Sequence, residues 1–173
     1  MILNKTTFSA CAVILSTLAL ASCGNSSDGQ ASNAVDVKYD SVVSLSSNKV
    51  LISDGDFFAL DVTASDLSAS EGGSVTLKFN PALVQVSSVN VNNSVWSFVN
   101  QNGTIDNVNG TISDIVFSSY QGVSGDAILA TVEFQSVSKG TSSIVVTASD
   151  VNPFASNGEV LNVLFETANV TAN

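Results

Sequence analysis

The sequence predicts an all-β fold, a two-sheet antiparallel sandwich of about eight or nine strands, over residues 41–173. Short segments rich in valine, isoleucine, phenylalanine and threonine recur there, and several alternate apolar and polar residues as half-buried strands do. Turns containing glycine, asparagine or proline separate these segments at the regular spacing of a sandwich. After residue 23, no stretch of 11 or more residues shows the spacing of apolar residues that is typical of a helix. Two sheets must therefore bury each other's inner faces.

Seven segments carry the strand pattern. In chain order they are residues 57–64, 74–79, 83–89, 111–119, 127–137, 142–149 and 160–172. The alternation in the second segment places Val75, Leu77 and Phe79 on one face. That strand must stop at Asn80-Pro81, because proline fixes φ and has no N–H to donate to a neighbouring strand.

Residues 1–22 are expected to be a signal peptide. Lys5 supplies the positive n-region, residues 8–20 form a mostly apolar h-region, and the small residues Ala21 and Ser22 precede a cleavage point. The apolar run is shorter than the ~20 residues that a membrane-spanning helix needs. The segment therefore predicts export from the cytoplasm.

Residues 20–23, Leu-Ala-Ser-Cys, resemble the lipobox of bacterial lipoproteins. The resemblance implies cleavage before Cys23, diacylglyceryl transfer to its sulfur, and a lipid anchor in the bacterial cell envelope. Cys11 leaves with the signal peptide, so Cys23 has no disulfide partner within the mature chain. Gly24 follows the cysteine, and by the same resemblance this favours the outer membrane in a Gram-negative bacterium. Residues 23–40 are then the lipidated N-terminus and a flexible, polar tether.

Charge and composition exclude several functions. The chain has 15 acidic residues and 5 basic ones, a net charge of −10, so nucleic acid is a poor partner. Anionic membrane surfaces are excluded as a charge-driven target, which leaves the lipid anchor as the only membrane contact. The chain has no histidine, and hence no Ser-His-Asp arrangement and no histidine metal ligand. Phosphate-binding loops and nucleophile elbows are also absent, so we do not expect an enzyme.

Five segments in order carry a further resemblance. SDGDFFALDVTASDL (53–67) opens on a turn before a strand, and SVTLKFNPALVQVSSV (74–89) joins two strands through an Asn-Pro corner. The third and fourth segments are 96–119 and 124–151, and a closing strand follows at 158–172. Together, residues 42–172 resemble the cohesin family, the β-sandwich modules of cellulosomes. The resemblance implies a cohesin-like jelly roll that binds a partner protein of the dockerin type through one sheet face.

The strands matching that face are expected around 95–100 and 111–120. The candidate partner-face residues are those expected outside the core, namely Ser97, Asn100, Ser113, Ser118 and Tyr120. One alternative is a carbohydrate-binding module, in which Trp96 and Tyr120 form a small platform with Asn100 and Gln121. The competing interpretation of Trp96 is that it plugs one end of the sandwich. Another alternative is a structural envelope protein without a ligand.

Asp54 and Asp56, in the sequence Ser-Asp-Gly-Asp, are weak candidates for calcium ligands. Calcium takes 6–8 oxygen ligands, and the EF-hand pattern with its bidentate glutamate is absent. We therefore interpret these residues as a turn. No metal and no cofactor is expected apart from the covalent lipid on Cys23.

Overall fold

The computed structural model describes residues 37–173. The predicted signal peptide, Cys23 and residues 23–36 of the predicted tether lie outside the described residues. Residues 37–173 contain no helix, and so nothing in this part of the chain forms a helix able to cross a membrane. The strands are β1 (Ser41–Leu45), β2 (Lys49–Ile52), β3 (Phe57–Lys78), β4 (Val84–Val91), β5 (Gln101–Asp106), β6 (Thr111–Ser136), β7 (Gly140–Ala148), β8 (Ala155–Ser156), β9 (Glu159–Val160), β10 (Val163–Phe165) and β11 (Thr167–Ala172).

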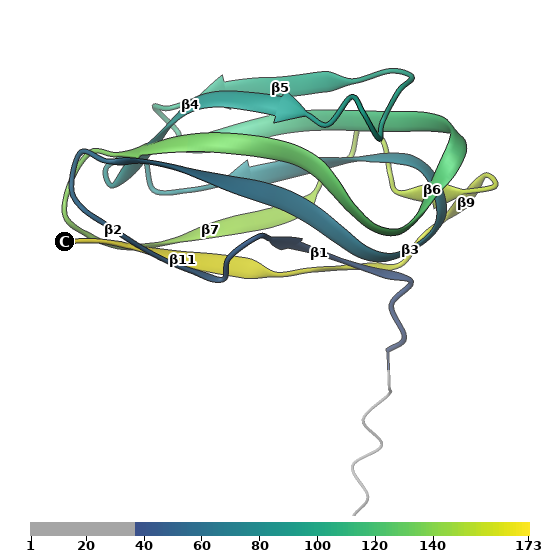
Figure 1. The fold of residues 1–173 in the computed structure, drawn as a ribbon, viewed down its shortest axis with the longest axis horizontal. Coiled ribbons are helices and arrows are strands. Elements are labelled where there is room, and N and C mark those ends of the chain that lie inside the picture. Colours follow the sequence, from purple (N-terminus) through teal and green to yellow (C-terminus); the bar gives the residue numbers. More distant parts are fainter. Residues whose placement is uncertain (1–36) are drawn as a thin grey trace, which may run out of the picture. The chain divides into compact units, whose positions relative to one another are not determined.

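The strands form two stacked layers, as predicted (Figure 1). One layer has the order β4-β6-β3-β1-β10 and uses the first part of β3 with the last part of β6. The other has the order β5-β6-β3-β7-β11-β2 and uses the last part of β3 with the first part of β6. Most pairs are antiparallel, but β10 with β1 and β2 with β11 are parallel. The all-β sandwich is confirmed, and the expectation of purely antiparallel pairing is wrong at these two pairs.

The strands β3 and β6 belong to both layers, and this changes the strand count. We expected 57–64 and 74–79 to be separate strands, and likewise 111–119 and 127–137. Each pair of segments is instead one continuous strand, because the connecting residues stay paired, as Leu67 with Gly125 and Ser70 with Val123. Register shifts and the left-handed residues Asp66 and Gly122 let the paired strands bend from one layer into the other. With the short strands included, residues 37–173 form eleven strands rather than eight or nine.

Alternating apolar residues from both layers fill the core. The predicted inward set of Val75, Leu77 and Phe79 is buried. Phe134 is fully buried at the centre, stacked on Phe58 with ring centroids 5.2 Å apart and edge-on to Phe79 at 6.0 Å. The alternation of apolar residues in the sequence therefore identified the face of β3 that is buried in the core.

The corner after β3 has the predicted geometry. The strand ends at Lys78, and Asn80 then organises the turn. Its side-chain oxygen accepts from the Ala82 N–H at 3.0 Å, and its backbone carbonyl accepts from Val84 at 3.1 Å. The Asn-Pro sequence therefore acts as a structural corner.

The last residues of the predicted tether belong to the sandwich. Asp40 and Asn162 exchange two hydrogen bonds of 2.8 Å, one between backbone groups and one from the Asn162 N–H to the Asp40 carboxylate. The Asn162 amide also donates to the Lys38 carbonyl at 2.9 Å. The prediction of a flexible tether is therefore wrong for residues 38–40, because Asn162, just before β10, bonds to the Lys38 carbonyl and the Asp40 N–H.

Asparagine side chains occupy the outer edge of β4. The Asn107 amide accepts from the Val86 N–H at 2.8 Å and donates to the Val86 carbonyl at 2.9 Å, as a neighbouring strand would. The Asn102 oxygen accepts from the Val91 N–H at 3.0 Å. An open edge of this kind is a template for pairing with another chain, and these amides cover part of it.

We expect Asn107→Ala to lower the free energy of unfolding by about 1–3 kcal/mol, because both Val86 backbone groups lose their partner. Urea unfolding followed by circular dichroism measures this, and the Val86 amide should exchange with solvent faster. The matched control is Asn90→Ala, an exposed asparagine on the same strand. An equal loss in both variants would contradict the role of Asn107 at this edge.

Candidate functional site

The outward face of β5, β6, β3 and β7 carries a row of hydroxyl side chains. Thr76 pairs with Thr147 across β3 and β7, and Ser113 pairs with Thr104 across β6 and β5. Thr76 lies between the buried residues Val75 and Leu77, so its side chain points outward. We call these four residues, Thr147, Thr76, Ser113 and Thr104, the hydroxyl face.

A second row on the same side of these strands carries two charges. Lys78 pairs with Val145 and with Thr111, and Thr111 pairs with Asp106. Hydrogen bonds from Asn109, and then from the Val108 N–H, hold the pKa of the Asp106 carboxyl below its ordinary value. Asp106 therefore stays ionised at neutral pH. The row presents one positive and one negative side chain beside the neutral hydroxyl face.

Residues 95–100 do not form the strand that we predicted. They form a loop, and its residue Trp96 has no exposed surface. The indole packs on Phe117 with ring centroids 4.8 Å apart, and its Nε1–H donates to the Ile128 carbonyl at 3.1 Å. Trp96 therefore cannot take part in a surface platform or a partner face. The interpretation that Trp96 plugs one end of the sandwich is confirmed, because its side chain is fully buried and its indole N–H has a hydrogen-bond partner, as buried tryptophans usually do.

Asn100 and Ser118 hold this loop on β6. The Asn100 oxygen accepts from the Ser118 N–H at 3.1 Å, and its amide nitrogen donates to the Asn93 side chain at 2.7 Å and to the Trp96 carbonyl. The Ser118 hydroxyl donates to the Val99 carbonyl at 2.8 Å and accepts from the Val99 N–H at 2.9 Å. The structure thus uses both predicted partner-face residues to fix the loop.

Tyr120 and Ser97 are exposed, as predicted, but neither belongs to the hydroxyl face. Tyr120 lies near the middle of β6, where that strand passes from one layer to the other, and Ser97 lies in the loop before β5. Tyr120 contacts Phe98, with ring centroids 3.9 Å apart, and 76% of Tyr120 and 51% of Phe98 is exposed. Sequence analysis missed Phe98, because phenylalanine next to a strand-like segment is usually a core residue. The six candidates are therefore not brought together: Trp96 is in the core, Asn100 and Ser118 hold the loop, Tyr120 is in the aromatic pair, Ser97 is an exposed loop residue, and Ser113 alone lies on the hydroxyl face.

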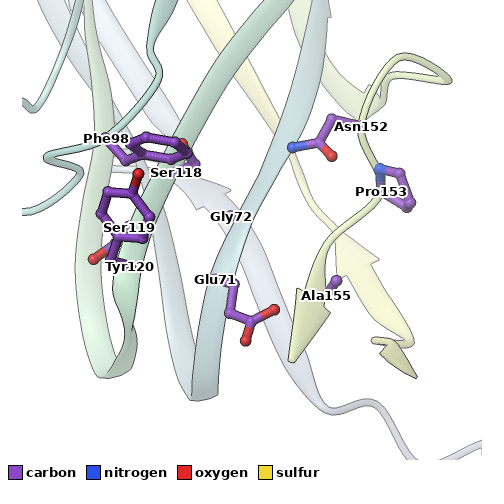
Figure 2. Close-up of a pocket in the computed structure, with 9 residues that line it drawn as sticks. All are labelled: Glu71, Gly72, Phe98, Ser118, Ser119, Tyr120, Asn152, Pro153 and Ala155. Atoms are coloured by element: carbon purple, nitrogen blue, oxygen red, sulfur yellow. The ribbon is translucent and has the colours of Figure 1, made fainter. Parts of the chain in front are cut away.

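The aromatic pair forms one wall of an open groove of about 360 Å³ (Figure 2). Asn152, Pro153 and Ala155, which follow β7, form the opposite wall. Glu71 and Gly72 of β3 lie between the two walls. The groove is therefore a second candidate site, distinct in its residues from the hydroxyl face.

Asp54 and Asp56 lie in the turn between β2 and β3. The Asp56 N–H donates to the Ser53 carbonyl at 3.2 Å, and Gly55 has a φ of +89°. The predicted turn is confirmed. Among residues 37–173 no three carboxylate or thiol side chains gather as a metal site would require.

Comparison with known proteins identifies the fold. No family model and no curated protein matches the chain. The solution structure of CaCohA2 from Clostridium acetobutylicum matches with a TM-score of 0.60 at 21% identity, covering 79% of this chain and 93% of that one. A non-cellulosomal cohesin from the archaeon Archaeoglobus fulgidus matches with a TM-score of 0.65 at 12% identity, covering 78% and 91%.

A third similar structure is the third cohesin of ScaC from Acetivibrio cellulolyticus, solved in complex with the ScaB dockerin. It matches with a TM-score of 0.59 at 17% identity, covering 76% of this chain and 98% of that one. The protein is thus a jelly-roll β-sandwich in which two long strands join the layers. More particularly, residues 37–173 form a domain with the cohesin fold, as the sequence resemblance implied.

Proposed function

We propose that this protein is a non-enzymatic adaptor, lipid-anchored in the bacterial cell envelope, whose cohesin-like domain binds a partner protein through the hydroxyl face. The observation that carries the proposal is the fold, since the similar cohesin from Acetivibrio cellulolyticus was solved with a bound dockerin. By that likeness the partner of this chain is of the dockerin type, with a calcium-binding pair of helices. The calcium dependence of partner binding is therefore part of the test.

The shape and chemistry of the hydroxyl face support a protein partner. The face spans four adjacent strands, and its side chains are short, so it suits a flat or helical surface better than a small molecule. Serine and threonine lose little side-chain entropy when a partner covers them. Lys78 and Asp106 on the neighbouring row add opposite charges, which can fix the orientation of a partner.

The test is capture of proteins from an extract of the source organism by the full chain, in calcium and separately with a chelator. We expect one specific protein to be captured, and Ser113→Arg to weaken its binding about tenfold or more by placing a long cation in the face. The matched control is Gln85→Arg, an exposed residue on β4 in the other layer. No specific protein in either condition, or equal loss in both variants, would contradict the proposal.

The lipid anchor has its own test, because Cys23 lies outside the described residues. We expect Cys23→Ser to abolish palmitate labelling and partitioning into detergent, since the acylated sulfur is lost. The wild-type chain expressed in the same cells is the reference. A variant that keeps both properties would show that the protein is not anchored through Cys23.

A further inference from the structure

An exposed aromatic pair forms one wall of the groove and is held rigidly. Phe98 and Tyr120 contact each other and together expose a large ring surface to solvent. The loop that carries Phe98 is fixed by the Phe98 N–H to the Ser118 carbonyl at 3.1 Å and by the buried Trp96. Exposed apolar patches mark binding sites, and rigid anchors reduce the entropy lost on binding.

The polar groups that face the groove remain available to a ligand. The backbone of Asn152 is fixed by Ser74, whose hydroxyl donates to the Asn152 carbonyl at 2.6 Å and accepts from its N–H at 3.0 Å. Glu71 and Tyr120 are exposed and Asn152 is half-buried, so the carboxylate, the phenol hydroxyl and the side-chain amide of these residues are accessible from the groove. The groove therefore offers hydrogen-bond acceptors and donors opposite an aromatic wall (Figure 2).

The charge of the groove selects against anions. Glu71 is the only ionisable carboxylate in its lining, and no lysine contributes to it. An anionic ligand would be repelled, whereas a neutral polyol can donate hydroxyl hydrogens to Glu71 and Asn152. The volume of about 360 Å³ lies at the small end of the range for ligand sites, roughly 300–1,000 Å³.

We propose that this groove binds one pyranose unit of a neutral polysaccharide. The apolar C–H face of the sugar ring stacks on Tyr120 and Phe98, and its hydroxyl groups bond to Glu71 and Asn152. This activity goes beyond the proposed protein binding and uses different residues. It replaces the platform containing Trp96, because that indole is buried.

The test is native electrophoresis of the full chain in gels that contain hydroxyethylcellulose, xylan, galactomannan or dextran. The full chain is proposed to carry a lipid anchor, so it is kept in solution with a detergent. That detergent must have a polyoxyethylene head group, because a sugar head group would compete for the groove. We expect retardation in at least one polysaccharide, and affinity about tenfold lower for Tyr120→Ala and for Asn152→Ala. Phe57→Ala removes a phenylalanine that is 67% exposed outside the groove, and it should be retarded like the wild type.

Thermal unfolding checks that each variant is folded. We expect the Tyr120 and Phe57 variants to fold, because both side chains are exposed. No retardation in any gel, or equal retardation of wild type and Tyr120→Ala, would overturn the sugar assignment. It would also be overturned if Tyr120→Ala weakened only the capture of a protein partner. Ser113→Arg should leave retardation unchanged, so failure of the protein-binding proposal is distinguishable from failure of this one.

Discussion

Trp96→Ala is expected to lower the free energy of unfolding by about 3–5 kcal/mol, the range for removing a large buried aromatic side chain. The indole has no exposed surface, packs on Phe117, and closes one end of the core. Its removal leaves a cavity, and the Ile128 carbonyl loses its 3.1 Å donor while keeping the Asn92 side-chain amide at 3.3 Å. Since whole domains are stable by only about 5–15 kcal/mol, this is a large fraction of the total.

Urea unfolding measures the loss, with Tyr120→Ala as the control, because that ring is exposed and its removal should cost far less. If Trp96→Ala does not fold, the wild-type chain supplies an independent measurement. Trp96 is the single tryptophan, so its fluorescence should be blue-shifted and resistant to acrylamide quenching. A loss below about 1 kcal/mol, or ready quenching, would contradict the burial of this residue.

Gly110→Ala should be nearly as damaging, by about 2–5 kcal/mol, from overpacking combined with left-handed backbone strain. Gly110 has a φ of +69°, and an added Cβ would lie 2.1 Å from the Phe79 carbonyl oxygen and 2.6 Å from Pro81 Cδ. The Gly110 carbonyl also accepts from the Phe79 N–H at 2.9 Å. The turn before β6 therefore cannot move away without breaking its contact with the end of β3.

The matched control is Gly125→Ala. Gly125 has a similar φ of +79°, but nothing lies within 4 Å of the added Cβ, so only the backbone strain of about 1–2 kcal/mol remains. The difference between the two variants in urea unfolding isolates the steric clash. Equal losses would show that the close approach of Gly110 to Phe79 is not present in solution.

The sequence was sufficient to predict the sandwich and its core period. Val75, Leu77 and Phe79 alternate and are buried, and Asn80-Pro81 forms the expected corner. These features are local, because strand alternation and proline geometry depend on neighbouring residues in the chain. The resemblance to cohesins then implied a jelly roll, an arrangement of strands that local patterns alone do not specify.

The candidate site was predicted less well, because exposure depends on contacts between distant segments. Trp96 and Phe98 are two residues apart in one loop, yet one is fully buried and the other half exposed. Asn100 and Ser118 look like surface polar residues in the sequence, but they bond to each other across the loop and β6. The continuity of β3 through both layers likewise depends on its pairing with β6, which the sequence does not display.

Photo-crosslinking in the native host tests most directly whether the hydroxyl face contacts a protein. A photoreactive amino acid is placed at Ser113 on this face or, as the control, at Gln85 on β4 in the other layer. We predict one light-dependent crosslink to a single protein from position 113, identified by mass spectrometry, and none to that protein from position 85. The same crosslink from both positions, or no crosslink from position 113, would contradict the claim.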